Sequence, residues 1–210
     1  MSTRTSRRRS LRQVARTIGT IALVAVLLPL LASCGVNSIP TYQQQAKAAW
    51  AEVLNQYQRR TDLIPNLVST VKGAADFESK TLEAVVEARA KVGQMQLPAD
   101  LLTNPQAMKA FEQNQAALTS ALSRLLVVSE QYPELKANAN FQTLQAQLEG
   151  TENRIAVARR DYIAAVQQYN TELVTFPGRI WAWLLYSDAK EMAQFTIDDN
   201  AATVPAVNFN

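Results

Sequence analysis

Two carboxylates and an arginine late in the chain have the types and the spacing to do chemistry. Glu149, Glu152 and Arg159 lie three and seven residues apart in a stretch that reads as one helix, so they share a face. Paired carboxylates can carry out general acid–base catalysis, which also needs a pocket and a perturbed pKa. Polar residues inside helical bundles more commonly fix helix register through ion pairs and hydrogen bonds. No sequence feature indicates a pocket, and we favour the register interpretation.

The composition excludes most other catalytic chemistry. The 210 residues include no histidine and a single cysteine. The lack of histidine excludes Ser-His-Asp and Cys-His nucleophilic catalysis. It also excludes histidine zinc sites and the Glu-x-x-His motif of di-iron bundles. We therefore expect no catalytic residue, no metal and no cofactor, and a hydrolase is the least favoured function.

The single cysteine, Cys34, follows a segment typical of an export signal. Six arginines precede an apolar run from Ile18 to Leu31, and small residues follow that run. The sequence Leu31-Ala32-Ser33-Cys34 resembles the lipobox of bacterial lipoproteins, in which the cysteine is lipidated and becomes the new N-terminus. This predicts a signal peptide over residues 1–33 and a lipidated tether over 34–40. An uncleaved single-pass signal anchor in the inner membrane is the alternative, although the run is shorter than the roughly 20 residues of a spanning helix.

The residues around the expected cleavage site also bear on location and partners. Gly35 follows the cysteine, where inner-membrane lipoproteins carry an aspartate. In a two-membrane bacterium we therefore expect attachment to the outer membrane, with the rest of the chain in the periplasm. Removal of the six leader arginines leaves 15 of the 21 basic residues against 18 acidic ones, a net charge of −3. No surface for nucleic acid is expected, and the predicted partners are the membrane and an unidentified envelope protein.

Strong helix-forming residues dominate the chain beyond the tether. We expect helices over about 41–60, from 61 to about 92, from Asn104-Pro105 to Pro133, and over about 137–175. Pro65 leaves two possibilities open, namely a new helix capped by Thr61 or Asp62, or one long helix kinked at the proline. The third helix has the most regular repeat, averaging 3.5 residues. Its expected seam residues are Met108, Phe111, Gln115, Leu118, Leu122, Leu125, Ser129 and Tyr132.

These elements predict an all-α fold, an elongated up-down antiparallel four-helix bundle over residues 41–192. The most aromatic stretch, Ile180–Tyr186, contains Trp181 and Trp183 and is too short to span a membrane. A short helix packed on the bundle, a patch that docks a partner, and an interfacial membrane contact all suit these amphipathic side chains. A polar, extended tail is expected over residues 193–210.

Several blocks of the sequence resemble the LemA family. They are Arg59-Arg60-Thr61-Asp62-Leu63-Ile64-Pro65-Asn66-Leu67-Val68, Glu149-Gly150-Thr151-Glu152-Asn153-Arg154-Ile155-Ala156-Val157-Ala158-Arg159, and Phe176-Pro177-Gly178. The resemblance implies a helical-bundle protein of the cell envelope without established enzymatic activity, and one branch of the family is associated with magnetosome membranes. Phe77-Glu78 stands where the family often has His-Glu, so any role of that histidine does not transfer.

The matching blocks supply the candidate structural or interaction residues. These are Arg59, Arg60, Asp62, Pro65, Asn66, Glu152, Asn153, Arg154 and Arg159, with Trp181 and Trp183 added from the aromatic stretch. We expect a non-enzymatic, lipid-anchored envelope protein that acts as a helical scaffold or interaction module. The alternative is a ligand-binding bundle with a polar site between helices, around Asp62, Asn66 and Arg154.

Overall fold

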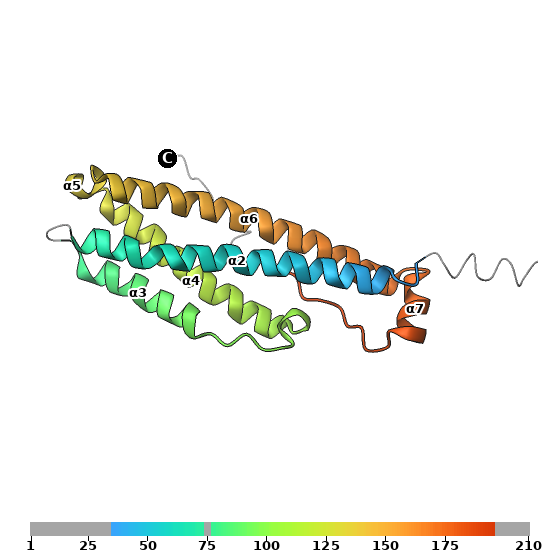
Figure 1. Ribbon diagram of the computed structural model, residues 1–210. Helices are drawn as coiled ribbons and strands as arrows, with labels where there is room; N and C mark the ends of the chain where they lie inside the picture. The colour runs from blue at the N-terminus through green and yellow to red at the C-terminus, as the bar shows by residue number, and fades with distance from the viewer. Residues whose placement is uncertain (1–34, 74–76, 196–210) are drawn as a thin grey trace, which may run out of the picture.

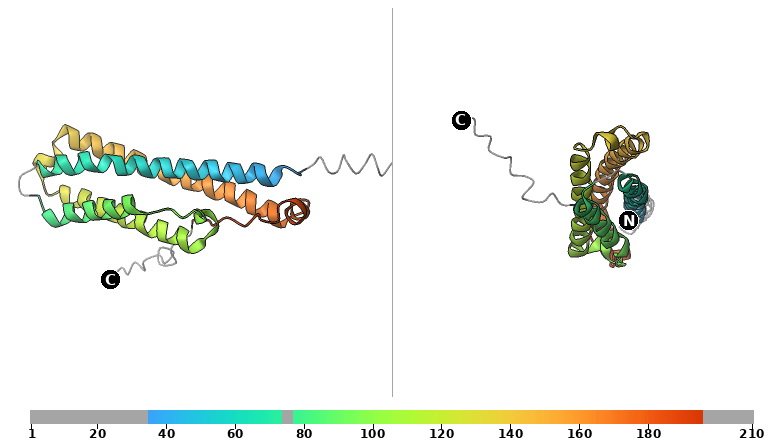
Figure 2. Two further views of the ribbon diagram at one scale, coloured as in Figure 1. Left: turned by 60° about the horizontal axis from the view of Figure 1, so that its bottom comes forward. Right: turned by 90° about the vertical axis from the view of Figure 1, so that its left-hand side faces the viewer.

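Two long helices extend along the whole length of the molecule. The computed structural model describes residues 35–73 and 77–195, and within these ranges the regular structure is entirely helical. Helices α2 (Ser38–Lys72) and α6 (Ala139–Val174) run antiparallel and side by side along the whole length of the bundle (Figure 1). Helices α3 (Ser79–Gln94) and α4 (Pro105–Ser129) pack together as a shorter second pair (Figure 2). The expected all-α antiparallel bundle is confirmed.

Helix α2 continues through Pro65 without interruption, which decides between the two possibilities that the sequence left open. Proline has no N–H, so the carbonyl of Thr61, four residues earlier, loses its helical partner. Arg89 on α3 takes that place, because its Nε donates to the Thr61 carbonyl at 3.4 Å. The Thr61 hydroxyl also donates to the Tyr57 carbonyl at 3.0 Å. A side chain from a neighbouring helix thus satisfies the group that proline leaves unpaired.

The first break in helical structure comes at Gly73 rather than at Pro65. Helix α2 ends at Lys72, and α3 begins only at Ser79. The expected helix from 61 to about 92 is therefore wrong in its extent, since its first part belongs to α2 and its last part to α3. Glycine inside a helix costs about 1 kcal/mol relative to alanine, which makes Gly73 a weak point for continuation.

The starts of α4 and α6 follow a common capping scheme. The Asn104 side chain accepts hydrogen bonds from the backbone of Gln106 at 3.1 Å and Ala107 at 3.2 Å, which confirms the start expected at Asn104-Pro105. Asn138 caps α6 in the same way. A single turn, α5 (Pro133–Lys136), precedes it. The expected seam of α4 is buried from Met108 to Ser129.

The interior divides into two apolar clusters along the bundle. One lies where α3 and α4 cover α2 and α6, and its buried members include Ile64, Leu82, Leu118 and Phe141. The other lies nearer the start of α2 and is aromatic. The Trp50 ring centroid is 5.2 Å from that of Phe111, 5.3 Å from Tyr162 and 5.9 Å from Phe195. Residues from the beginning, middle and end of the described chain thus build one core.

The end of the described chain closes this aromatic cluster. Helix α7 (Gly178–Leu185) lies across the end of the bundle, and residues 186–195, here called the C-terminal strap, return along it (Figure 1). Asn170 exchanges two hydrogen bonds with the Met192 backbone, at 2.9 and 2.8 Å, and the Tyr162 hydroxyl donates to the Ala193 carbonyl at 2.8 Å. The boundary expected after residue 192 falls inside this segment, because Phe195 is buried in the core. The expected signal peptide, the proposed lipidation site Cys34 and the expected tail beyond residue 195 lie outside the described residues.

Candidate functional site: a buried arginine network

A buried arginine joins three helices of the bundle. Arg60 on α2 is only 1% exposed. Its Nη1 donates to Glu152 Oε1 on α6 at 2.8 Å and to Thr119 Oγ1 on α4 at 2.7 Å. Its Nη2 donates to Gln115 Oε1 on α4 at 2.6 Å. The guanidinium carbon lies 5.0 Å from the centroid of the Tyr57 ring. We call Arg60, Glu152, Gln115 and Thr119 the arginine network.

The helical repeat explains why this charge is buried. On α2, Val53, Tyr57, Arg60 and Ile64 follow steps of four, three and four residues, so Arg60 lies on the apolar stripe. Gln115 occupies a seam position of α4 in the same way. A buried guanidinium must be paired and hydrogen-bonded to be tolerated. The network supplies that pairing from two other helices.

The network holds a charge pair but leaves little room for chemistry. The Glu152 side chain is 39% exposed, so the ion pair reaches the surface on one side. Arginine keeps its proton at every physiological pH and cannot act as an acid or a base. Burial raises the pKa of Tyr57 beside the network, while the charges of Arg159 and Arg60 oppose that rise. The described residues also contain no group of three or more Cys, Asp or Glu side chains placed to hold a metal ion.

The structure brings together only two of the polar residues that the sequence singled out, Arg60 and Glu152. Asp62 is exposed and accepts a hydrogen bond from Gln58 at 2.7 Å. Arg154 is exposed, with Nη2 3.5 Å from Thr151 Oγ1. Asn66 is exposed as well and lines a shallow groove with Thr143 and Gln147. The three residues of the alternative inter-helix site therefore have separate neighbours, and within the described chain no hydrogen bond joins them.

The remaining candidates have diverse surroundings. Arg59 and Asn153 are exposed, and Pro65 lies within α2. The Arg159 guanidinium carbon lies 4.3 Å from the centroid of the Phe195 ring, a cation–π contact that covers the C-terminal strap. Trp181 is half-buried against the aromatic cluster, whereas Trp183 is 79% exposed.

Two residues that contribute to these interactions, Thr119 and Arg89, were not predicted from the sequence, and Gln115 was predicted as a seam residue but not as a partner of Arg60. Gln115 was expected in the α4 seam, and a lone amide in an apolar stripe is a signal for a buried polar partner. Thr119 lies one turn further on and was not considered. Arg89 had no local signal, because its acceptor at Thr61 exists only where Pro65 removes the helical donor.

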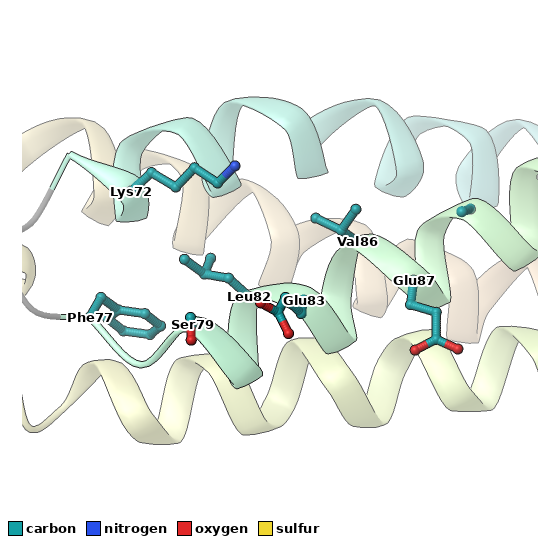
Figure 3. Close-up of a pocket in the computed structure, with 8 residues that line it drawn as sticks. Lys72, Phe77, Ser79, Leu82, Glu83, Val86 and Glu87 are labelled. Atoms are coloured by element: carbon teal, nitrogen blue, oxygen red, sulfur yellow. The ribbon is translucent and has the colours of Figure 1, made fainter.

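A second feature is an open groove at the far end of the molecule. The groove, here called the tip groove, lies between the last turn of α2 and the outer face of α3 and has a volume of about 680 Å³ (Figure 3). Its apolar lining comes from Phe77, Leu82 and Val86, and Lys72 and Glu83 lie at its sides. Phe77 packs against the Tyr132 ring, with the two ring centroids 4.8 Å apart.

The elongated antiparallel bundle, joined internally by the arginine network, places the chain among the all-α helical-bundle proteins. A sequence model described as the LemA family matches residues 49–209, and the chain belongs to this family. The chain is 27% identical over 209 residues to Magnetosome protein MamQ 2 of Paramagnetospirillum magneticum, covering 90% of this chain and 74% of that protein. It is 25% identical over 214 residues to Magnetosome protein MamQ of Magnetospirillum gryphiswaldense, covering 93% and 76% respectively.

Proposed function

We propose that this chain is a cell-envelope protein tethered to a membrane at its N-terminus, whose helical bundle is a non-enzymatic interaction module. The observation that carries this proposal is the separation of its two ends. The chain enters α2 at Ser38, just after the leader, and the tip groove begins at Lys72, the last residue of the same helix. At about 1.5 Å per residue, a 35-residue helix places the groove roughly 50 Å from the tether.

The polar side chains support an interaction role over a catalytic one. The most deeply buried charge, Arg60, is engaged by the bundle itself, which leaves it unavailable to a substrate. The relatives named as magnetosome proteins support a role at a membrane. No helix among the described residues is both long and apolar enough to cross a bilayer. In this proposal the tether is the leader, with a lipid on Cys34 and the bundle facing the periplasm.

The tether is tested by replacing the cysteine in the full chain. Cys34→Ala should abolish incorporation of a clickable fatty acid, because the thiol is the proposed acylation site. Ser33→Ala keeps a small residue before the cysteine and should retain the label. Label that persists in Cys34→Ala contradicts lipidation at this site. A chain that is unlabelled but still sediments with membranes supports the uncleaved signal anchor instead.

The interaction role is tested by site-specific photo-crosslinking in intact cells. A photoreactive residue at Val86, which is 47% exposed in the tip groove, should give a discrete crosslinked protein. The same residue at Val127, which is 68% exposed on α4, is the matched control and should give none. The same products from both positions would contradict a partner at the tip groove.

A further inference from the structure

Helix α7 presents apolar side chains to solvent on its outer side. Ile180 is 47% exposed, Trp183 79%, Leu184 57% and Leu185 56%. Phe176, just before the helix, is 82% exposed. We call these five residues the α7 patch. The helix carries one charged residue, Arg179, which is also exposed. Clustered exposed residues of this kind mark an interaction site rather than scattered surface apolarity.

Contacts between α7 and the rest of the bundle fix the helix with the α7 patch facing solvent. The inner side of α7 is already used, since Trp181 and Ala182 pack against the aromatic cluster. At the start of the helix, Gly178 is pressed against α6, where an added Cβ would lie 2.1 Å from the Glu172 carbonyl oxygen. Beyond the helix, the Asn170 pair fixes the strap at Met192. The patch therefore cannot turn inward without unpacking Trp181.

The patch lies where the chain leaves the bundle toward its tether. Gly35, with φ of +98°, adjoins α7, because a Cβ there would lie 3.5 Å from Pro177 Cγ and 3.9 Å from Trp181 Nε1. The Ser38 hydroxyl lies 2.5 Å from Glu172 Oε1, which ties the start of α2 to the end of α6. Figures 1 and 2 show α7 beside the start of α2, turned across the bundle end.

The proposed lipid anchor is close to Gly35 in the sequence. Gly35 is one residue from the proposed acylated cysteine and four residues from the end of the apolar run at Leu31. A residue spans at most about 3.6 Å, so with either form of tether the hydrocarbon begins within roughly 15 Å of Gly35. An apolar helix with an outward indole and an arginine has the composition of an interfacial membrane contact.

Resting on the proposed membrane tether, we infer that the α7 patch inserts into the bilayer surface beside it. The tether alone leaves the bundle free to tilt, and the patch adds a second point of contact. Because α7 runs across the bundle end, seating it in the plane of the membrane makes the long helices project outward (Figure 1). The tip groove is then held away from the lipid surface.

The test measures the depth of a fluorescent label on the full chain in vesicles of phosphatidylcholine and phosphatidylglycerol. An environment-sensitive label on Leu184→Cys should shift to the blue and lose emission to quenchers attached to lipid acyl chains. The same label on Val127→Cys, which is also exposed but lies on α4, should do neither. Adding Ile180→Ser and Trp183→Ser should reduce quenching at position 184, while the vesicles still carry the protein.

The outcomes separate this inference from the proposed function. Protein that floats with vesicles while the label at 184 stays unquenched overturns insertion of α7 but keeps the tether. A blue shift without lipid quenching means that protein, such as a second copy of the chain, covers the patch, and it also overturns the inference. Protein that fails to float overturns both.

Discussion

In the arginine network, we expect removal of Glu152 to lower the free energy of unfolding more than removal of Arg60. Glu152→Ala leaves the Arg60 guanidinium buried without its counter-charge, and breaking a buried pair in this way costs about 3–5 kcal/mol. Because Glu152 is 39% exposed, we expect the lower end, about 3 kcal/mol. Arg60→Met removes the buried charge and fills much of its volume, and the Glu152 carboxylate then turns to water. The remaining cost is the unpaired Gln115 amide, about 1–2 kcal/mol.

The assay is urea unfolding of the full chain in a mild detergent, followed by circular dichroism at the helix band. With an m-value of about 2 kcal/mol/M, Glu152→Ala should lower the midpoint by about 1.5 M and Arg60→Met by less than 1 M. The double variant should cost much less than the sum of the two, because the counter-charge has nothing to stabilise once Arg60 is gone. Arg59→Met and Glu149→Ala, exposed neighbours on α2 and α6, are the controls and should change stability by less than about 0.5 kcal/mol.

Two results would refute this reasoning. If Arg60→Met costs more than Glu152→Ala, the guanidinium contributes mainly through packing rather than through a charge that needs its partner. If the two costs add in the double variant, the 2.8 Å ion pair carries no coupling and does not fix the register of α2 against α6.

Three further predictions concern single features of the fold. Arg89→Met should cost about 1 kcal/mol by leaving the Thr61 carbonyl unpaired, and Pro65→Ala should remove that cost by restoring the backbone donor, which a double-mutant cycle measures. Burial raises the pKa of Tyr162 above its ordinary value of 10.0. The free energy of unfolding should therefore be constant below pH 10 and fall above it by about 1.4 kcal/mol per pH unit, because only the unfolded chain then loses the Tyr162 proton. Urea midpoints at successive pH values measure this, and equal midpoints at pH 9 and 11 would contradict it. Gly178→Ala should cost about 1–3 kcal/mol, because its Cβ would meet an α6 carbonyl at 2.1 Å, and an unchanged thermal midpoint would show that α7 shifts freely.

Local patterns predicted the parts of this fold that local interactions determine. The seam of α4 was readable because each buried side chain recurs at the helical repeat, and Asn104-Pro105 marked its start because the cap lies within three residues of its donors. Arg60 and Glu152 were singled out, but their pairing was not, because it depends on how far α2 and α6 slide past each other.

The features that the sequence did not predict depend on contacts between distant residues. The continuity of α2 through Pro65 depends on Arg89, which belongs to another helix. Met192 and Phe195 in the C-terminal strap are buried. The strap lies beyond the last helix, so no helical repeat in the sequence indicates which of its side chains point inward. The outward face of α7 could not be predicted either, because its inner and outer residues are alike in hydrophobicity. Only packing distinguishes Trp181, which contacts the aromatic cluster, from Trp183, which is exposed.

The C-terminal strap has a consequence for how the protein matures. Phe195, the last described residue, completes an aromatic core whose first ring, Trp50, belongs to the beginning of the chain. Contacts between such distant residues form late, because the loop that joins them must first be closed. This half of the core cannot form until residue 195 has been synthesised, so the growing chain remains incompletely folded up to that point. A chain that ends before residue 192 would leave Trp50 and Tyr162 without this cover and present exposed aromatic rings to cellular proteases.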